Sequence, residues 1–369
     1  MTALQPVDPA WERLIDSLRP LAPVKPGESL ESIFSGLQRP ECVLTHSSGS
    51  VFVSDRRGGV LRIHRDGTQD LVGGPGVIGG PGVIGGPGLT GSPTGNSNPA
   101  DRPPLLPNGI AMQRDGAFLV ANLGGQGGVW RIAPDGVASP WLMEVDGRPV
   151  HRVNFVMNDS GDISNKQDRV WACISATDGS DAYPLRTATG YIVLRDAAGT
   201  RIVADGLHYT NECRVSLDGQ FMYVNETFGR RLSRFRIGKT GELTDKETVA
   251  TFGEGDFPDG LALDAEGGAW VVCVGSNRVY RIAPDGKKLT VIDDADPATA
   301  KQLEAAFLAG TLNRPQLSAA RGRRLRNVTS LAFGGADLRT VYMGCLAGDS
   351  LATFRSPVAG VQPVHWNWP

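Results

Sequence analysis

The sequence predicts an all-β fold, a six-bladed β-propeller with four-stranded blades. The first observation is a recurring phrase, in which a polar residue is followed eight positions later by glycine and then by an apolar run. It occurs in LPNGIAMQRDGAFLVAN (106–122), YTNECRVSLDGQFMYVN (209–225) and FPDGLALDAEGGAWVVC (257–273). The second is the roughly 45–50 residue spacing of such phrases, which is typical of propeller blades. The third is composition, because 48 Gly and 25 Pro in 369 residues favour turns over long helices.

Six phrases of this kind predict six blades, and the third phrase is one residue shorter than the others. Their polar first residues are Glu41, Asn108, Asn154, Asn211, Asp259 and Asn327. Each phrase predicts a strand, a turn and a second strand, with RDG, NDSGD, LDG and AEGG as turns. Third strands follow in GVLRIHRDG, GVWRIAPDG, RLSRFRIGK and RVYRIAPDGK, and KKLTVID reads as a fourth. We therefore expect an N-terminal extension over 1–30 and one propeller over 31–369, with a segment within 20–40 closing the ring.

Composition and charge exclude several classes of protein. A formal net charge of −2 gives no broad electrostatic footprint for nucleic acid or an anionic membrane. No apolar run approaches the roughly 20 residues that span a bilayer, and the first residues lack a signal-peptide pattern. We expect a cytoplasmic protein with a small-molecule substrate and no nucleic-acid or membrane partner. The five cysteines form no CxxC pair, so buried free thiols are expected.

The polar first residues predict a cation site on the propeller axis. If the first strand of each blade lines the central channel, these residues converge at one end of it. Side-chain oxygens of Glu, Asn and Asp are the ligands that hard divalent cations prefer. Buried carboxylates also need a partner charge or a cation. At any single position, capping of a turn by Asn or Asp is the alternative.

Several phrases resemble a known family over residues of about 38–360. PDGLALDAEGGAWV, RNVTSLAFGG, DLRTVYMG and PECVLTHSSGSVFVSD are similar to signatures of the senescence-marker-protein/gluconolactonase/luciferin-regenerating propellers. The resemblance implies one divalent metal ion, with Ca²⁺ as the first choice and Zn²⁺, Mn²⁺ or Mg²⁺ as alternatives. It implies that the ligands are Glu41, Asn154, Asn211 and Asp259, and that Arg152 contacts the substrate. Phe155 and Glu212 depart from the residues that usually follow the family's two Asn ligands.

The resemblance implies a metal-dependent hydrolase, a lactonase that opens a sugar lactone or another small cyclic ester with metal-activated water. Asp259 would serve as ligand and base, while Arg152 would orient the substrate. Two alternatives stay open: a non-catalytic calcium- or ligand-binding propeller, and an esterase or phosphotriesterase using the same metal site. Substrate contacts are also expected from three residues near the ligands, Asn108, Glu212 and Asn327. A turn-capping role for the two Asn and a solvent-facing role for the Glu are equally open.

Three insertions are expected on the metal face, where they would act as lids. Residues 73–104 are a Gly/Pro-rich repeat, 175–190 lie between two strands of blade three, and 293–326 lie between blades five and six. The last of these predicts a short helix with Asp296 as its N-cap, Pro297 in the first position and Gly310 past its end. The GDSL sequence at 348–351 lacks the strand-to-helix context of a serine hydrolase, and no GxSxG motif occurs.

Overall fold

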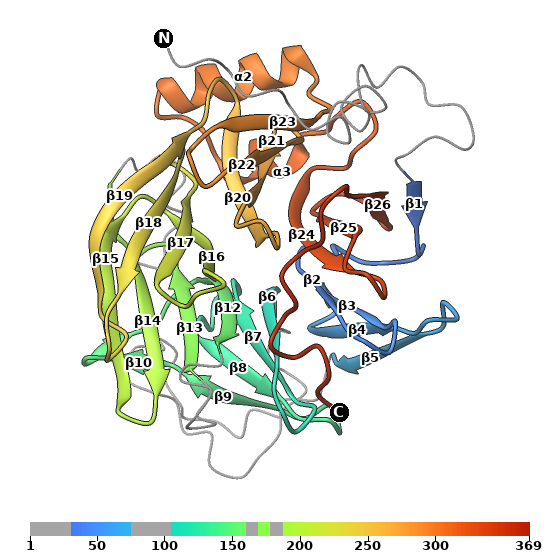
Figure 1. The fold of residues 1–369 in the computed structure, drawn as a ribbon, viewed down its shortest axis with the longest axis vertical. Helices are drawn as coiled ribbons and strands as arrows, with labels where there is room; N and C mark the ends of the chain where they lie inside the picture. The colour runs from blue at the N-terminus through green and yellow to red at the C-terminus, as the bar shows by residue number, and fades with distance from the viewer. Residues whose placement is uncertain (1–30, 75–104, 160–168, 178–186) are drawn as a thin grey trace, which may run out of the picture.

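The computed structural model describes residues 31–74, 105–159, 169–177 and 187–369. These residues form six four-stranded antiparallel sheets, which are arranged around a central axis (Figure 1). The predicted six-bladed propeller is therefore confirmed. The expected extension over 1–30 and nearly all of the insertion at 73–104 lie outside the described residues.

In blades one to three, the strands follow the chain outward from the axis. Blade one consists of β2 (Val43–Thr45), β3 (Val51–Asp55), β4 (Gly59–Ile63) and β5 (Gln69–Gly73). Blade two consists of β6 (Pro107–Met112), β7 (Phe118–Asn122), β8 (Val129–Ile132) and β9 (Ala138–Leu142). A small hairpin of β10 (Glu144–Val145) and β11 (Arg148–Pro149) follows. Blade three consists of β12 (Val153–Asp159), β13 (Arg169–Ile174), β14 (Gly190–Asp196) and β15 (Gly199–Leu207).

Blades four and five repeat this order, and blade six is completed from the other end of the chain. Blade four consists of β16 (Thr210–Val215), β17 (Phe221–Glu226), β18 (Arg231–Ile237) and β19 (Leu243–Thr251). Blade five consists of β20 (Asp256–Leu263), β21 (Ala269–Gly275), β22 (Arg278–Ile282) and β23 (Lys288–Asp293). Blade six consists of β24 (Val328–Gly334), β25 (Thr340–Cys345), β26 (Leu351–Arg355) and β1 (Glu31–Ile33).

The pairing of β1 with β26 closes the ring. Ser32 lies opposite Ala352 and Ile33 lies opposite Leu351 in an antiparallel register. The closing strand therefore falls within the segment 20–40, as the sequence analysis expected. Because β1 precedes blade one in the chain and supplies the outer edge of blade six, backbone hydrogen bonds within blade six join the N-terminal and C-terminal parts of the described chain.

The innermost strands are irregular where the predicted ligands lie. In blades three, four and five the register with the second strand slips by one extra residue, at Asn154, at 211–212 and at 259–260. Such β-bulges break the alternation of side chains and aim one of them in a new direction. Gly260 fits its bulge because a Cβ there would meet the Thr329 carbonyl oxygen at 2.4 Å. The bulges thus position polar side chains at the end of the channel.

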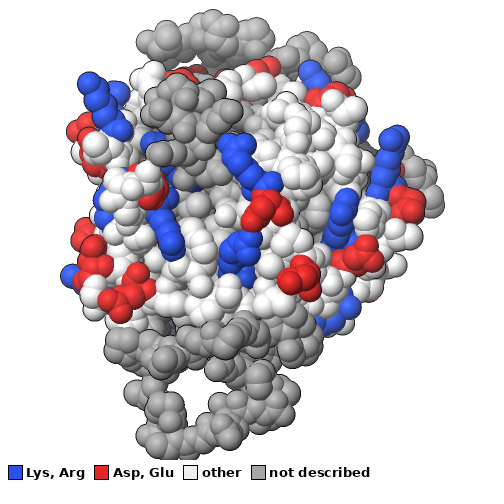
Figure 2. Space-filling model, turned by 90° about the horizontal axis from the view of Figure 1, so that it is seen from below, with Lys and Arg blue, Asp and Glu red and all other residues white. Residues whose placement is uncertain are grey.

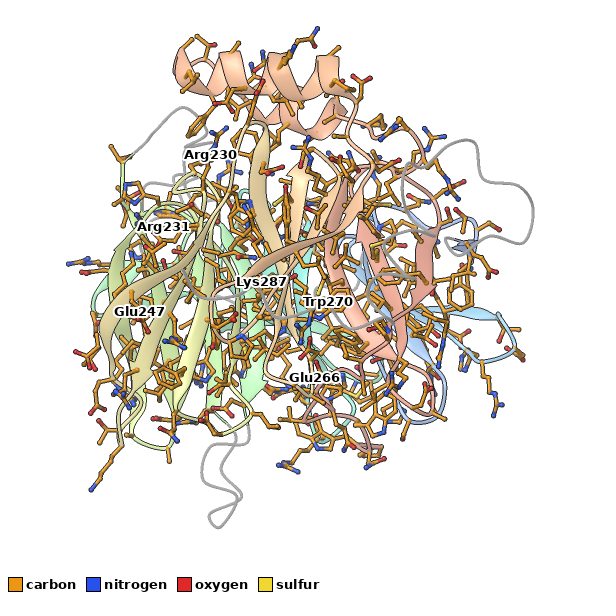
Figure 3. The ribbon with its side chains drawn as sticks, turned by 45° about the horizontal axis from the view of Figure 1, so that its top comes forward. Arg230, Arg231, Glu247, Glu266, Trp270 and Lys287 are labelled. Carbon is orange, nitrogen blue, oxygen red and sulfur yellow. The ribbon has the colours of Figure 1, made fainter. Side chains whose placement is uncertain are left out.

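The insertion between blades five and six forms two helices. The first, α2 (Pro297–Leu308), has Asp296 as its N-cap, and this side chain accepts a hydrogen bond from the Thr299 N–H at 2.8 Å. The second, α3 (Arg314–Ala319), was not expected from the sequence and is capped by Asn313. Arg230 lies beneath α2 in Figure 3, where it forms an ion pair with Glu304 of the helix.

An apolar cluster fastens these helices to the propeller. Its buried members are Tyr209, Phe228, Phe257, Val274, Leu303, Leu312, Leu317 and Ala320, and Phe307 and Leu346 pack against it. The ring of Phe228 lies 4.8 Å from that of Tyr209 and 6.2 Å from that of Phe307, measured between centroids. The insertion at 293–326 therefore packs on the propeller, and all of it lies within the described residues.

The C-terminal segment 356–369 crosses the other end of the channel; it is the dark red coil that ends at the C-terminus in Figure 1. It contacts blade five through the Val361 N–H, which donates to the Leu263 carbonyl at 2.9 Å. It contacts blade one through His365, whose Nε2 is 3.2 Å from the Thr45 carbonyl oxygen, and through His46, whose Nε2 is 2.8 Å from the Trp368 carbonyl oxygen. The segment therefore connects blade five to blade one on the face opposite the helices.

The cysteines, the surface charges and the helices can be compared with what the composition predicts. All five cysteines are buried and free, as expected. On the face seen in Figure 2, Lys and Arg are interspersed with Asp and Glu, and no large field of one sign forms there. Among the helices of the described ranges, none has the length and apolarity that crossing a bilayer requires.

Candidate metal and substrate site

Five of the eight predicted site residues line one small cavity at the helix-covered end of the channel. These five are Glu41, Asn108, Asn154, Asn211 and Asp259. The cavity measures about 30 Å³, and Arg314 and Leu317 of α3 contribute to its lining. Residues from five blades thus meet beneath the inserted helix. Whether the four predicted ligands bind an ion stays a prediction.

Hydrogen bonds fix the orientation of the first pair of amides. Asn108 Nδ2 donates to Asn154 Oδ1 at 3.1 Å and to the Asn154 carbonyl oxygen at 2.9 Å. Arg39 Nη2 donates to Asn108 Oδ1 at 2.7 Å, while its Nη1 donates to the Pro107 carbonyl at 2.8 Å. Arg39 and Asn108 therefore hold Asn154 with its side-chain oxygen in a defined direction, which is the role of an outer shell around a ligand.

A different residue orients Asn211. Asn211 Nδ2 donates to Thr227 Oγ1 at 3.0 Å, and this hydroxyl donates to the Pro258 carbonyl oxygen at 2.8 Å. The hydroxyl hydrogen is thereby committed to Pro258, so Thr227 accepts from Asn211 and leaves Oδ1 as the outward atom of the amide.

The carboxyl groups of the cavity are held in an environment that disfavours their charge. The pKa of Glu41 is raised to about 7, mainly by burial; the charge of Arg39 opposes this rise and the charge of Glu212 adds to it. Burial also raises the pKa of Asp259 well above its usual range, with added repulsion from Glu41 and Glu212. Acids held so close together are stabilised by a cation, which would favour their ionised forms.

The residues present fit an oxygen-liganded divalent ion. Within the described chain, Asn211 Oδ1 is buried and accepts no hydrogen bond. An orphaned buried oxygen beside two carboxyl groups is the donor set of a hard cation. No three His, Cys, Asp or Glu side chains gather as a metal-binding group in the part of the chain that the structure describes. The predicted set contains only two acids, Glu41 and Asp259, and takes its other donors from amides.

Two further predicted residues lie next to the cavity and do not line it. Glu212 is buried in the channel, where it pairs with Arg214 at 3.0 Å and accepts the Leu261 N–H at 3.0 Å. Burial raises the pKa of Glu212 to about 7, and Arg214 opposes that rise. The Arg152 guanidinium donates from Nη1 to the carbonyl of Leu123, a wall residue, at 3.3 Å. Glu212 therefore affects the cavity through its charge, which raises the pKa of Asp259, and Arg152 affects it through its hydrogen bond to Leu123.

Asn327 does not line the cavity, because the turn after the first strand of blade six lies three residues later in the phrase than it does in blades one and five. In blades one and five the turn-closing N–H belongs to the glycine of the phrase, Gly49 or Gly267, but in blade six it belongs to Leu338. The strand position that Asn108 occupies in blade two is therefore taken by Ser330, three residues later. Ser330 Oγ donates to the Glu41 carbonyl oxygen at 2.5 Å.

Asn327 instead supports the inserted helix. Its fully buried amide accepts from the Gly275 N–H at 2.8 Å and donates to the Leu317 carbonyl at 2.8 Å. The expectation of a pocket-lining Asn327 is corrected accordingly, because the eight-residue spacing in this blade runs from Ser330 to Leu338 and Gly335 does not close the turn.

Three further residues line the cavity and were not predicted from the sequence: Arg39, Thr227 and Arg314. Arg39 lies two residues before Glu41, and its adoption of a positive φ of 54° gives no signal in the sequence. Thr227 follows the second strand of blade four and is recognisable only once Asn211 is seen beside it. Arg314 depends on the fold of a helix whose six residues are too few for a clear periodicity.

A second cavity of about 650 Å³ lies at the opposite end of the channel. It is bounded by inner-strand residues such as Phe155 and Leu331 and by His365 of the C-terminal segment. It is much the larger of the two, but its lining contains none of the eight predicted site residues. The chemistry-bearing side chains therefore identify the smaller cavity as the candidate site.

Comparison with known proteins matches part of this chain to one family. Residues 151–301 match the family model of the SMP-30/Gluconolactonase/LRE-like region. Regucalcin of Danio rerio is 29% identical over 160 residues, covering 42% of this chain and 45% of that protein. A 6-deoxy-6-sulfogluconolactonase of Pseudomonas putida is 28% identical over 148 residues, covering 40% and 39%. The matched part spans less than half the length of either relative. The resemblance noted in the sequence is confirmed.

Solved structures agree on the fold. A gluconolactonase from Xanthomonas campestris has a TM-score of 0.61 at 17% identity, covering 90% of this chain and 91% of the other. A luciferin-regenerating enzyme has a TM-score of 0.61 at 16% identity, covering 91% and 98%. At this identity the similarity establishes the propeller architecture over most of the chain.

Proposed function

We propose that this protein is a divalent-metal-dependent hydrolase that opens lactones. The observation that carries the proposal is the meeting of two buried carboxyl groups with the side-chain oxygens of two Asn, one of which, Asn211 Oδ1, lacks a donor in the described chain. The family match of residues 151–301 and the lactonase among the relatives support the same class of reaction.

Glu41, Asn154, Asn211 and Asp259 would hold one cation through their side-chain oxygens. When bound, such an ion supplies Lewis acidity toward a carbonyl oxygen and toward water. We propose Ca²⁺ as the ion, because all donors are oxygens and two of them belong to neutral amides. Zn²⁺, Mn²⁺ and Mg²⁺ are the alternatives to be compared with it by metal titration.

The chain's own residues would carry the proton. The Asp259 carboxylate accepts a proton from water while the water oxygen bonds to the lactone carbonyl carbon. The ring C–O bond then breaks, and Asp259 returns the proton to the departing ring oxygen, so that the product is an open hydroxy acid. Arg39, Asn108 and Thr227 keep the amides oriented during this sequence. Arg152 is proposed to orient the substrate from the Leu123 side of the cavity.

Replacing Asp259 tests this proposal. We expect Asp259→Asn to lower kcat for lactone opening by at least a hundredfold, because it removes the proton acceptor and weakens the cation site. Acid release from a lactone panel at constant pH gives kcat, and circular dichroism checks the fold. Glu247→Gln, in an exposed outer-strand position, is the matched control and should retain wild-type kcat.

Two results would count against the proposal. Wild-type turnover by Asp259→Asn would exclude the proton-transfer role. Tight binding of Ca²⁺, measured by metal analysis and calorimetry, with no turnover of any lactone or ester would favour the alternative of a non-catalytic calcium-binding propeller.

A further inference from the structure

The upper wall of the candidate cavity is apolar. Six of its lining residues carry apolar or aromatic side chains and come from separate loops and elements: Leu123, Tyr209, Phe228, Val274, Leu317 and Leu346. Five of them are at most 8% exposed, and Leu346 is partly buried. This apolar wall faces the polar floor on which the four predicted ligands lie. A molecule bound to the floor therefore rests its remaining surface on hydrocarbon.

Several polar groups of the floor are already hydrogen-bonded. Asn108 bonds to Arg39 and Asn154, and Thr227 bonds to Asn211 and to a backbone carbonyl. Asn211 Oδ1 accepts no hydrogen bond within the described chain, and it is one of the oxygens proposed to hold the cation. Arg314 of α3 also lines the cavity, in addition to the charged residues Arg39, Glu41 and Asp259. With the cation bound, few uncharged polar groups of the floor remain as partners for hydroxyl groups on a bound ring.

This arrangement discriminates between lactones. A polyhydroxylated sugar lactone would bury hydroxyls against the apolar wall, and a buried hydroxyl without a hydrogen-bond partner disfavours binding. A lactone with an alkyl or aromatic substituent would instead bury apolar surface there, which favours binding. The apolar wall therefore discriminates between two lactones by the polarity of the substituents on the lactone ring.

We propose that the substrate is a lactone carrying an apolar substituent, and that the apolar wall determines this specificity. The proposal rests on the proposed lactonase function. Because the cavity measures only about 30 Å³, such a substrate enters when Leu317 and the rest of α3 withdraw, and it then takes the place of that side chain against Phe228 and Leu346.

The experiment compares two lactones on the metal-loaded full-length protein. Dihydrocoumarin represents the apolar class, and glucono-1,5-lactone represents the hydroxylated class. We expect kcat/KM for dihydrocoumarin to exceed that for gluconolactone by at least tenfold. Leu346→Asn should lower kcat/KM for dihydrocoumarin about tenfold and change that for gluconolactone less than twofold. Leu308→Asn, the same replacement at an exposed position of α2, is the control and should leave both values unchanged.

The outcomes are distinguishable. Preference of the wild-type protein for gluconolactone, or an equal effect of Leu346→Asn on both substrates, would overturn the proposal and leave the wall as a packing surface for α3. Turnover of neither lactone by the loaded protein would instead contradict the proposed function itself. If Leu346→Asn does not fold, Leu346→Ala replaces it, with the same expected ordering.

Discussion

Thr227 shows how a residue outside the predicted ligand set controls one inside it. An amide offers an oxygen and a nitrogen, and only the oxygen binds a cation. Thr227 Oγ1 engages the nitrogen of Asn211 and is itself fixed by the Pro258 carbonyl, so the oxygen is left for the cavity. At Asn154 the hydrogen bond is made to the oxygen instead, because Asn108, itself held by Arg39, donates its Nδ2 to Asn154 Oδ1 and so fixes the direction of that oxygen. Single hydrogen bonds therefore decide which atoms are available.

Thr227→Val tests this role at the scale of one side chain. The replacement keeps the shape but removes the oxygen that accepts from Asn211 Nδ2, so the amide is free to turn. We expect Ca²⁺ affinity to fall by 10- to 100-fold, as is typical when an outer-shell partner of a metal ligand is lost. Calorimetric titration of metal-free protein measures the change. Thr227→Ser retains the hydroxyl and should bind within twofold of wild type; equal affinity for both variants would contradict the role.

At the scale of elements, α3 decides how open the cavity is. It contributes Arg314 and Leu317 to the lining, and its last turn is held by Asn327, which bridges the Gly275 N–H and the Leu317 carbonyl. The apolar cluster beneath α2 and α3 supplies the rest of the attachment. A six-residue helix is marginal by itself, so these tertiary contacts account for its position.

Asn327→Gly tests this attachment. Glycine accepts the positive φ of 64° found at this position, so the replacement removes the two side-chain hydrogen bonds without adding backbone strain. We expect a loss of about 1–3 kcal/mol in the free energy of unfolding and faster amide hydrogen exchange within 312–322. Mass spectrometry of the exchanged protein gives the local result. Unchanged exchange in that segment would show that the apolar cluster alone holds α3.

The sequence predicted some elements better than others for identifiable reasons. The helix at α2 was predicted with its cap because Asp296 and Pro297 are local signals whose meaning does not depend on the rest of the fold. The position of Asn327 was not predicted, because the turn of blade six closes at Leu338, three residues after the glycine of the phrase, so that the equivalent position falls on Ser330. Arg314 became a site residue only through the tertiary packing of α3, which no local pattern encodes.

At the scale of the whole molecule, the C-terminal segment connects blades that are far apart in the chain. His365 is 7% exposed, and burial is the main reason that its pKa is lowered to about 4. The neutral ring is therefore the form that fits the folded protein. An unfolded chain would protonate this histidine near pH 6.5, so the folded state loses stability as the pH falls from about 6.5 to 4.

We expect His365 to contribute a pH-dependent term of roughly 3 kcal/mol over that interval, because each pH unit between the two pKa values corresponds to about 1.4 kcal/mol. Urea unfolding at pH 7.5, 6 and 4.5 measures it for the wild type and for His365→Gln. The variant should lose less stability on acidification than the wild type, since every other titratable group is shared. Parallel pH profiles would contradict the expectation.

The pairing of β1 with β26 has a consequence for biosynthesis. Residues 31–33 leave the ribosome long before their hydrogen-bonding partners at 351–353. Five blades find all of their strands nearby as the polypeptide emerges, but the sixth has to wait until residues 351–353 have emerged. Closure of the ring thus follows the synthesis of all the other blades, and a nascent chain stalled before residue 351 would present an unsealed sheet edge to chaperones and proteases.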